Sequence, residues 1–402
     1  MANSPLTPVD EVVDRLMAEV QCLVGIESIS VSLSRGRVLA EAVISPINVP
    51  LLSNSAMDGY AVNTADVAIG TVLAVSDRIP AGTVGKTLKP GTAARIFTGA
   101  PIPQGANAVV IQEDTTQREA GVEIHEVPRH EENIRRAGQD IVAGAEVLPC
   151  GHRLRAQDLG LVSSVGCADV RVFKKLKVAV MSTGDELIEP PCALQPGQIY
   201  NSNQYTLLAL IDSLGMEPVD LGLVGDSPQA TDAALRKGAE LADCILSTGG
   251  VSVGEEDHVK AAVERLGVLD IWRLAIKPGK PLAFGQVASK PFFGLPGNPV
   301  STFVTFMMIA RPYLLKSQGL NNISLPEFYG AAAFKVTAGS RREYLRVRLS
   351  YDESGHSRVE SFQNQGSGVM SSVCWATGLA QVEPGQTIDI GDQLKVHIFT
   401  NE

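Results

Sequence analysis

The stretch KVAVMSTGDEL, residues 177–187, followed by SNQYTLLALIDSLG, residues 202–215, decides the fold. KVAVM is a short apolar run typical of a buried strand, STGDEL has the composition of a loop, and the second segment has the length and apolar spacing of a helix that ends at Gly215. The same unit recurs at VDLGLVGD (219–226), DCILSTGG (243–250) and PFFGLPGNP (291–299), each followed by a segment with helical features. Repeats of this unit predict a doubly wound, largely parallel sheet with helices on both faces.

The segments on either side of this region have a different pattern. Near the N-terminus, Thr7, Pro8 and Asp10 indicate a helix start, and apolar residues then follow helical spacing at Val9, Val12, Val13, Leu16 and Val20. Residues 45–139 are short valine- and isoleucine-rich runs interrupted by Gly and Pro, which predicts a β domain. Residues 144–173 indicate a short helix between strands, and alternating segments from about residue 325 onward predict a C-terminal β domain.

The composition is that of a globular protein. The chain has 402 residues, of which 45% are hydrophobic and 19% charged, and its length indicates several domains with sizeable cores. The formal net charge of −10 argues against sequence-independent binding of nucleic acid, because such binding depends on clustered Lys and Arg. An anionic substrate would therefore have to meet local cations. The six cysteines lie far apart without a Cys-x-x-Cys pair, and we expect them to be reduced thiols.

The N-terminus and the apolar segments give no sign of a membrane protein. The N-terminus lacks a basic segment followed by an apolar core. The longest strongly apolar stretch, residues 303–310, is far shorter than the roughly 20 residues that span a bilayer. We therefore expect a soluble, cytoplasmic protein that binds no membrane.

Polar and glycine-rich loops follow the predicted parallel strands. In an open α/β sheet, ligands bind beyond the carboxyl ends of the strands, where backbone N–H groups and helix N-termini attract anions. Glycines there let the backbone approach a phosphate or a flat ring, while hydroxyls and amides donate hydrogen bonds. The loops therefore predict a site for a phosphorylated ligand, built from Ser182, Thr183, Gly184, Asp185, Glu186, Asp226, residues 247–254 (with Ser247, Gly249, Gly250 and Ser252), Asp257, Pro296, Gly297, Asn298 and Pro299.

The same loops carry carboxylates, whose presence beside a bound phosphate has to be explained because both groups are negatively charged. They would repel the ligand unless a hard divalent cation lay between them, and magnesium is usually held by one or two carboxylates together with phosphate oxygens. Asp226 and Asp257 are the first choice for such ligands. A single Asp at a strand end is more often a helix cap or a surface acid, but several acids meeting at one rim favour the metal.

Three other segments permit more than one interpretation. KPGKP (277–281) holds Lys277 and Lys280 three residues apart, either as an oxyanion clamp or as a solvated basic turn. In NSAMDGYAV (54–62), the Asp58-Gly59 pair favours a tight hairpin over a catalytic role. The basic stretch at residues 129–136 is interpreted as solvated surface, and the six histidines show neither zinc spacing nor a catalytic triad.

Taken together, the segments resemble the molybdopterin molybdenumtransferase family, which comprises the MoeA proteins and the E domains of gephyrin-like proteins. The matching motifs run in the family's order from residue 54 to residue 372: NSAMDGYAV, RIFTGAPIPQGANAVV, NIRRAGQDI, STGDEL, GQIYNSN, STGGVSVGEEDH, AIKPGKPLAFG, GLPGNPVS and QGSGVMSS. Agreement of nine ordered motifs does not arise by chance.

The resemblance implies an architecture and a reaction. The architecture has a small α/β domain from residues 1–45 and 146–176, an inserted β domain at 46–145, a molybdopterin-binding-like α/β domain at 177–324 and a C-terminal β barrel at 325–402. The implied reaction uses adenylylated molybdopterin, molybdate and Mg²⁺. Molybdate enters, the phosphoanhydride is hydrolysed, and AMP and molybdenum cofactor leave.

The resemblance also implies roles for individual residues. Catalytic roles carry over onto Asp58, Thr98, Glu186, Asp226, Asp257 and Lys277. Pterin and phosphate binding is assigned to Ser182, Thr183, Gly184, Ser247, Gly249, Gly250, Ser252, Pro296, Gly297 and Asn298. Molybdate binding is assigned to Lys277, Lys280, Ser301, Arg346 and Ser367, and magnesium to Asp226 and Asp257.

Partners follow from the same resemblance. It implies a homodimer in which Asp58 and Thr98 of the inserted domain reach the site of the other subunit, with a molybdopterin adenylyltransferase and molybdoenzyme maturation proteins as further partners. Two competing interpretations remain. The sheet domain alone resembles the molybdopterin adenylyltransferases, and gephyrin-like relatives also serve as scaffolds or cofactor carriers. The segment at 45–145 and the KPGKP and QGS motifs favour the transferase.

Overall fold

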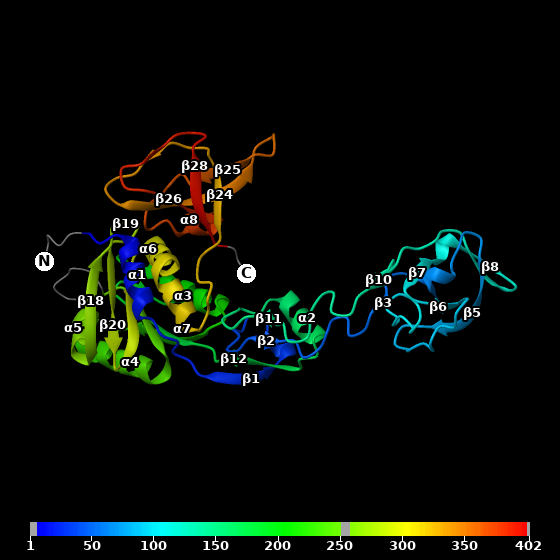
Figure 1. The fold of residues 1–402 in the computed structure, drawn as a ribbon. Coiled ribbons are helices and arrows are strands. Elements are labelled where there is room, and N and C mark those ends of the chain that lie inside the picture. Colours follow the sequence, from blue (N-terminus) through cyan, green and yellow to red (C-terminus); the bar gives the residue numbers. More distant parts are fainter. Residues whose placement is uncertain (1–5, 251–257, 400–402) are drawn as a thin grey trace.

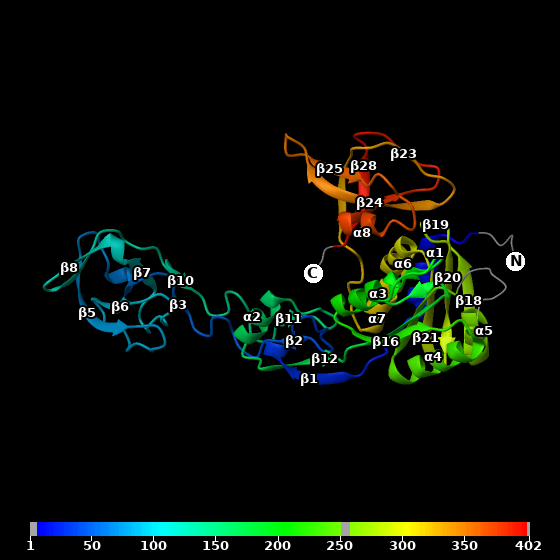
Figure 2. The ribbon, with the colours of Figure 1, turned by 180° about the vertical axis from the view of Figure 1, so that it is seen from behind.

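The computed structural model describes residues 6–250 and 258–399. The molecule is elongated, with a β domain at one end and a sheet domain capped by a second β domain at the other (Figure 1). A small α/β domain lies between these two ends, and the same arrangement is seen from behind (Figure 2). The multidomain α/β fold with a largely parallel sheet, an inserted β domain and a C-terminal barrel is thus confirmed.

The small α/β domain is made of two distant chain segments. Strand β1 (Ile26–Ser30) pairs antiparallel with β12 (Asp169–Phe173), and β2 (Val43–Ile44) pairs with β11 (Glu146–Leu148). The 3-10 helix η1 (Val31–Leu33) and helix α2 (Ala156–Ser164) cover them. Their apolar side chains form one core, which includes Leu39, Leu154 and Val172. The chain therefore leaves this domain, builds the inserted domain and returns.

The inserted domain is a six-stranded sheet in the order β7-β4-β6-β5-β9-β8. The strands are β4 (Gly59–Val62), β5 (Val72–Ile79), β6 (Thr92–Ile96), β7 (Ala108–Ile111), β8 (Thr115–Arg118) and β9 (Gly121–Ile124). The 3-10 helices η2 (Thr64–Asp66) and η3 (Gln112–Asp114) follow β4 and β7. A pair of short strands, β3 (Asn54–Ser55) and β10 (Ile134–Arg135), joins this sheet to its linkers.

The hairpin expected at Asp58-Gly59 was wrong. Strand β3 pairs with β10, whereas β4 pairs with β6 and β7, so the two strands that flank Asp58 do not pair with each other. Gly59 is needed for a different reason, because a Cβ atom there would overlap the carbonyl oxygen of Val110 on the neighbouring strand. Local turn chemistry could not reveal this, since the close approach comes from a strand 50 residues away.

The sheet domain has the strand order β16-β13-β17-β21-β20-β18. Strands β13 (Lys177–Thr183), β16 (Glu217–Val224), β17 (Cys244–Thr248) and β21 (Lys290–Leu295) are parallel, as predicted. Helices α3 (Ser202–Ser213), α4 (Pro228–Leu241) and α5 (His258–Leu266) follow β13, β16 and β17. A small two-stranded piece, β14 (Leu187–Ile188) and β15 (Ile199–Tyr200), precedes α3.

Two strands of this sheet were not anticipated. Strand β20 (Pro281–Val287) runs antiparallel to both β21 and β18 (Gly267–Arg273) and extends the sheet beyond its parallel part. The last helical segment is also less regular than predicted, because α6 (Pro299–Thr305) and α7 (Arg311–Ser317) are joined by the π-helical segment η4 (Phe306–Ala310).

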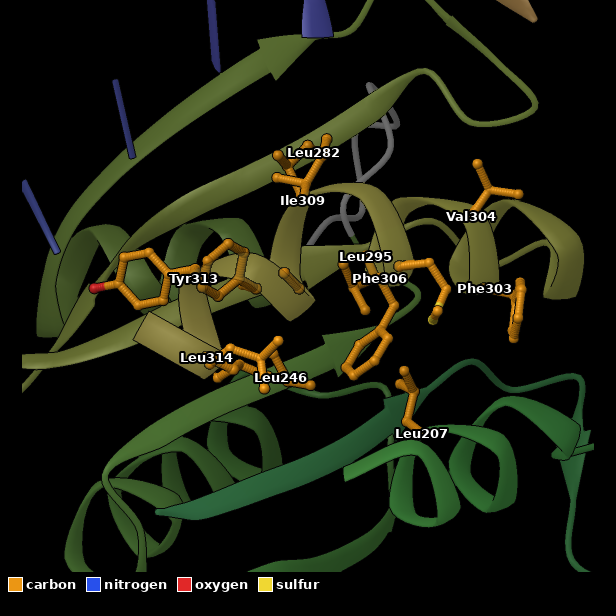
Figure 3. Close-up of a cluster of buried hydrophobic side chains, with 14 of the residues drawn as sticks. Leu207, Leu246, Leu282, Leu295, Phe303, Val304, Phe306, Ile309, Tyr313 and Leu314 are labelled. Carbon is orange, nitrogen blue, oxygen red and sulfur yellow. The ribbon is translucent and has the colours of Figure 1, made fainter. Parts of the chain in front are cut away.

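Both faces of the sheet are apolar, and successive side chains along a strand point to opposite faces. Val178 and Val180 of β13 join the core formed with α3, α6 and α7, whereas Ala179 and Met181 join the core formed with α4 and α5. Figure 3 shows part of the first core, in which Phe306 lies near Leu246 of β17 and Leu207 of α3. The cores on both faces hold the parallel strands in place. The candidate site lies at the carboxyl ends of these strands.

Helix α1 (Val9–Glu19) has the predicted apolar face, with Val9, Val12 and Leu16 buried. This face joins the core of the sheet domain, where α1 contacts α7 and η4. The domain boundaries inferred from the sequence stay a prediction, and the packing of α1 shows that at least this part of residues 1–45 lies on the sheet domain.

The C-terminal domain is a closed barrel. Its ring of five strands is β24-β25-β22-β28-β26, closed by pairing between β26 and β24. The strands are β22 (Glu327–Ala332), β24 (Arg342–Tyr351), β25 (Ser357–Ser361), β26 (Gly378–Val382) and β28 (Gln393–Ile398). Strands β23 (Val336–Thr337) and β27 (Thr387–Ile388) pair beside it, and helix α8 (Met370–Trp375) packs near α6. Strand β19 (Ile276–Lys277) of the sheet domain pairs with β24, which joins the two domains.

Candidate active site

Three parallel strands end side by side at one rim of the sheet. Ser182 of β13 is the register partner of Thr248 of β17, and Thr248 is the partner of Leu295 of β21. The loops that follow therefore start next to one another, as predicted for the ligand-binding edge. Among the predicted residues, Ser182, Thr183 and Ser247 are buried at these strand ends. Ser182 donates a hydrogen bond to Gln204 Oε1 at 2.7 Å, so its hydroxyl links the end of β13 to helix α3.

Glycines allow the loops to pack against one another. Gly249 and Gly250 both have positive φ, of 84° and 65°. A Cβ atom on Gly249 would overlap the carbonyl oxygen of Thr183, and one on Gly250 would lie 2.6 Å from Val259 Cγ2. Gly297 of the next loop lies directly beside Gly249. The two glycines that follow β17 thus pack closely against the neighbouring residues, which only glycine permits.

Asn203, to which we assigned no role, ties the loops together. Its side-chain amide donates to Thr248 Oγ1 and to the carbonyl oxygen of Gly297, both at 2.8 Å. It lies in the first turn of α3, two residues after the N-cap Asn201. The motif GQIYNSN contained this residue, but the sequence could not show which of the loops its amide would reach.

The acidic residues of the rim lie on neighbouring strand ends. Asp226 follows β16 and Glu186 follows β13, and the last residues of these strands, Val224 and Thr183, are register partners. Both acids are exposed, and the carboxylate of Glu186 lies over Gly184. Asp257 and Ser252 lie outside the described residues. Within the described residues, no group of three or more His, Cys, Asp or Glu side chains could hold a metal ion.

The lysine turn packs along α6. Gly279 has a φ of 92°, and a Cβ atom there would lie 2.9 Å from Thr305 Oγ1 and 3.6 Å from Ser301 Cβ. Lys277 Nζ lies 3.0 Å from Glu343 Oε1, with the lysine side chain half exposed and the glutamate nearly buried. Lys280 is exposed. The turn is therefore no freely solvated loop, since it is held against α6 on one side and the barrel on the other.

The loop that carries Ser367 reaches the same helix start. The backbone N–H of Val300 donates to the carbonyl oxygen of Ser367 at 3.0 Å, and Ser301 is buried in the first turn of α6. Four of the five residues assigned to molybdate, namely Lys277, Lys280, Ser301 and Ser367, thus belong to segments that meet here. The loop with Gly297 and Asn298 leads directly into this helix.

Arg346 lies behind this loop rather than on its surface. It is fully buried, and it donates to Ser372 Oγ at 3.1 Å and to the carbonyl oxygen of Gly366 at 3.3 Å. Burial lowers the pKa of its guanidinium to about 10. Arg346 therefore braces both ends of the loop that carries Ser367, and direct contact with molybdate stays a prediction.

Asp58 and Thr98 face each other at one edge of the inserted domain. The backbone N–H and the hydroxyl of Thr98 both donate to Asp58 Oδ1 at 2.7 Å. These hydrogen bonds, with a smaller contribution from the charge of Arg95, lower the pKa of the Asp58 carboxyl. The strands β4 and β6 that hold this pair lie at the end of the molecule opposite the sheet domain (Figures 1 and 2). Within one chain, the pair does not meet the rim.

A cavity of about 980 Å³ lies elsewhere, between the small α/β domain and α7. Its lining includes Arg35, His152 and Arg311, and none of the predicted site residues.

The structure also has no helix in its described part that is long and apolar enough to cross a membrane. All six cysteines are free in the structure.

Comparison with known proteins first defines the class of the rim. Residues 179–316, which carry it, match the family model described as a probable molybdopterin binding domain. Residues 7–166 match the MoeA N-terminal region (domain I and II), and residues 329–399 match the MoeA C-terminal region (domain IV).

Whole-chain relatives identify the family. The chain is 41% identical over 351 residues to the molybdopterin molybdenumtransferase of Haemophilus influenzae, covering 86% of this chain and 87% of that one. It is 35% identical to the enzyme of the same name from Nostoc sp., covering 95% and 92% of the two chains. The crystal structure of the molybdopterin biosynthesis MoeA protein from Pyrococcus horikoshii OT3 matches with a TM-score of 0.85 at 27% identity, covering 98% of this chain and 100% of that one. The chain belongs to the MoeA family.

Proposed function

We propose that this protein transfers molybdenum from molybdate to adenylylated molybdopterin and releases AMP. The observation that carries the proposal is the meeting of two kinds of loop at the start of α6. Glycine-rich loops suited to a phosphorylated ligand lie beside the lysine turn and the loop of Ser367, which suit an oxyanion. The names of the relatives from Haemophilus influenzae and Nostoc sp. support the same reaction.

The residues around α6 have the chemistry to hold molybdate. Molybdate is a tetrahedral dianion, and it would receive charge from Lys277 and Lys280 and hydrogen bonds from Ser301 and Ser367. Glu343, the buried partner of Lys277, holds the ammonium group beside the pairing of β19 with β24, where the sheet domain meets the barrel. Arg346 supports the arrangement by keeping the Ser367 loop against the helix start.

Magnesium would be held by Asp226, with Asp257 as the second ligand outside the described residues. The donor set at the rim fits the ion, because Mg²⁺ needs only one or two carboxylates when phosphate oxygens and water complete its shell. Asp226 is exposed at the strand end, where it can reach a bound ligand. When bound, the ion would neutralise phosphate charge. Glu186, exposed over Gly184, is the residue we assign to accept the proton of the water that cleaves the phosphoanhydride.

The complete site is proposed to form between two subunits. Asp58 and Thr98 have catalytic roles in the proposal, yet they lie far from the rim of their own chain (Figure 1). A two-fold dimer would place the inserted domain of one subunit against the sheet domain and barrel of its partner, and would create two equivalent sites. We propose this homodimer as the working form of a cytoplasmic enzyme.

One assay tests the proposal against its alternatives. Purified protein is supplied with adenylylated molybdopterin, Mg²⁺ and molybdate, and AMP is measured with time. A molybdenumtransferase releases AMP only when molybdate is present. An adenylyltransferase would instead consume ATP with free molybdopterin, and a scaffold or carrier would do neither, so either of these results would reject the proposal.

A further inference from the structure

Two arginines lie directly opposite each other in the inserted domain. Arg78 of β5 and Arg95 of β6 are register partners in their parallel pair. Like charges at opposite positions on neighbouring strands destabilise a sheet. Within the described residues, neither guanidinium forms an ion pair with a carboxylate. The pair therefore places two positive charges together, without a carboxylate in ion-pair contact among the described residues, on a protein whose net charge is −10.

Aromatic rings and neutral acceptors hold these charges in place. Both guanidinium carbons lie 4.7 Å from the centroid of the Phe97 ring. Arg95 also lies over the Tyr60 ring at 5.2 Å and donates to the carbonyl oxygen of Gly59 at 3.0 Å and to Gln112 Oε1 at 2.7 Å. These contacts orient the guanidiniums without neutralising them, which is the state needed to receive an anion.

The cluster borders the Asp58 and Thr98 pair. Phe97 directly precedes Thr98 in the sequence, and Gly59, which accepts the hydrogen bond from Arg95, directly follows Asp58. The cluster is open to ligands, because Arg78 is exposed and Arg95 and Phe97 are half-buried. A ligand that reaches Asp58 would therefore also meet the two arginines.

We propose that Arg78 and Arg95 bind the phosphate groups of the adenylylated pterin, with Phe97 and Tyr60 as positioning residues. The inference rests on the proposed function, which makes an adenylylated compound the substrate. Guanidinium groups bind phosphate oxygens through paired N–H donors, and two of them held on adjacent strands match a diphosphate. In the proposed dimer, each inserted domain brings this cluster to the phosphates held at the partner's rim.

The test uses pyrophosphate as the probe for binding and AMP release as the probe for turnover. Arg78→Met removes a guanidinium that makes no hydrogen bond within the described chain, so folding should be unaffected. Arg95→Lys keeps the charge and removes the planar fork. Arg118→Met is the matched control, because Arg118 lies in the same domain and is paired with Glu123. Calorimetry measures pyrophosphate affinity, and steady-state assays measure KM and kcat.

We expect Arg78→Met and Arg95→Lys to weaken pyrophosphate binding and to raise KM for the adenylylated pterin about tenfold, the loss typical of one charged hydrogen bond. The molybdate concentration for half-maximal turnover should not change, and Arg118→Met should behave as wild type. Unchanged pyrophosphate affinity in both cluster variants would overturn the inference, even if the enzyme is active. Absence of AMP release by the wild type would instead overturn the proposed function, while loss of pyrophosphate binding in the variants would still support the phosphate site.

Discussion

In the proposed function, single side chains around α6 distinguish molybdate binding from pterin binding. Lys280 is exposed on a turn whose Gly279 is pressed against Ser301 and Thr305. Ser367 is on a loop braced by the buried Arg346. Because these residues approach the helix from the barrel side, whereas Gly249 and Gly297 lie towards the sheet, their loss should affect one substrate and not the other.

The first prediction concerns Lys280. Lys280→Ala should raise the molybdate concentration needed for half-maximal AMP release about tenfold, because one charged contact to the oxyanion is lost. The KM for the adenylylated pterin should change much less. Steady-state kinetics with each substrate varied in turn measures both. Lys316→Ala, an exposed lysine in the last turn of α7, is the control. A loss of pterin affinity with an unaltered molybdate dependence would contradict the assignment.

The second prediction concerns Gly249, which has a positive φ and crowded surroundings that disfavour any residue with a Cβ atom. Gly249→Ala should displace the loop after β17 and reduce kcat/KM at least tenfold, and it should lower the free energy of unfolding by about 1–2 kcal/mol. Gly225→Ala provides the comparison, since a Cβ atom at Gly225 meets nothing within 4 Å and its φ is not positive. Kinetics and urea unfolding of both variants give the answer. Equal behaviour of the two would mean that the rim tolerates the displacement.

At the scale of elements, helix α2 shows how one cap joins a charge network. Asp158 Oδ2 accepts hydrogen bonds from the backbone N–H of Arg155 at 2.8 Å and from its Nε at 3.0 Å, and it lies 2.7 Å from His152 Nε2. The Arg155 side chain, opposed by desolvation and helped by His152, holds the pKa of the Asp158 carboxyl well below its usual value of 3.8. The start of α2 is thus stabilised by an ionised, nearly buried carboxylate.

The third prediction follows from that carboxylate. Asp158→Ala should lower the free energy of unfolding by about 2 kcal/mol at pH 7, through loss of the cap and its charged hydrogen bonds. Because the folded-state pKa is lowered, the stabilisation is fully present above the usual value of 3.8 and is lost as the pH falls through the folded-state value. The difference between variant and wild type, measured by urea unfolding from pH 7 to pH 3, should therefore shrink only at the acid end. A difference that shrinks already near pH 6 would contradict this origin of the stabilisation.

At the scale of the whole molecule, the elongated shape separates residues that the proposed chemistry needs together. The inserted domain carries Asp58 and Thr98 at one end, and the sheet domain carries Asp226 and Glu186 at the other. Several residues between them are exposed and apolar, including Leu51 at 62% and Leu52 at 52% exposure, next to the Asp58 segment. Such exposure favours a surface that is covered in an assembly.

The fourth prediction tests that assembly. Asp58→Ala and Asp226→Ala should each be inactive as homodimers. After subunit exchange, half of the dimers should be mixed, and each mixed dimer regains one site with both carboxylates. Activity should then return to about a quarter of wild type, if exchange is random and the sites are independent. Mass spectrometry of tagged subunits reports the exchange. If the mixture stays inactive although subunit exchange is proven, Asp58 and Asp226 of the same chain serve one site, and the shared-site model is wrong.

Local sequence patterns were sufficient for most elements and for the residues of the rim. The apolar runs, the helix starts and the glycines after each strand depend on interactions within a few residues, so the parallel strands and the loop sites could be predicted. The antiparallel strands β18 and β20 were not predicted. They lie at the edge of the sheet, and their pairing depends on the neighbouring strands and not on the period of their apolar residues. The prediction of a hairpin at Asp58-Gly59 was also wrong because the pairing of β4 is decided by the distant strands β6 and β7.

The sequence by itself determined the fold class, the order of the motifs and the chemical types gathered at the rim, because hydrophobic period and loop composition are properties of short segments. Only the tertiary structure decided that Asn203 links two loops, that Arg346 is buried behind the Ser367 loop, and that Arg78 faces Arg95 beside Phe97. Each of these contacts joins residues on different elements. Their geometry depends on strand register and helix packing, which arise when the whole chain folds and cannot be found in any one segment.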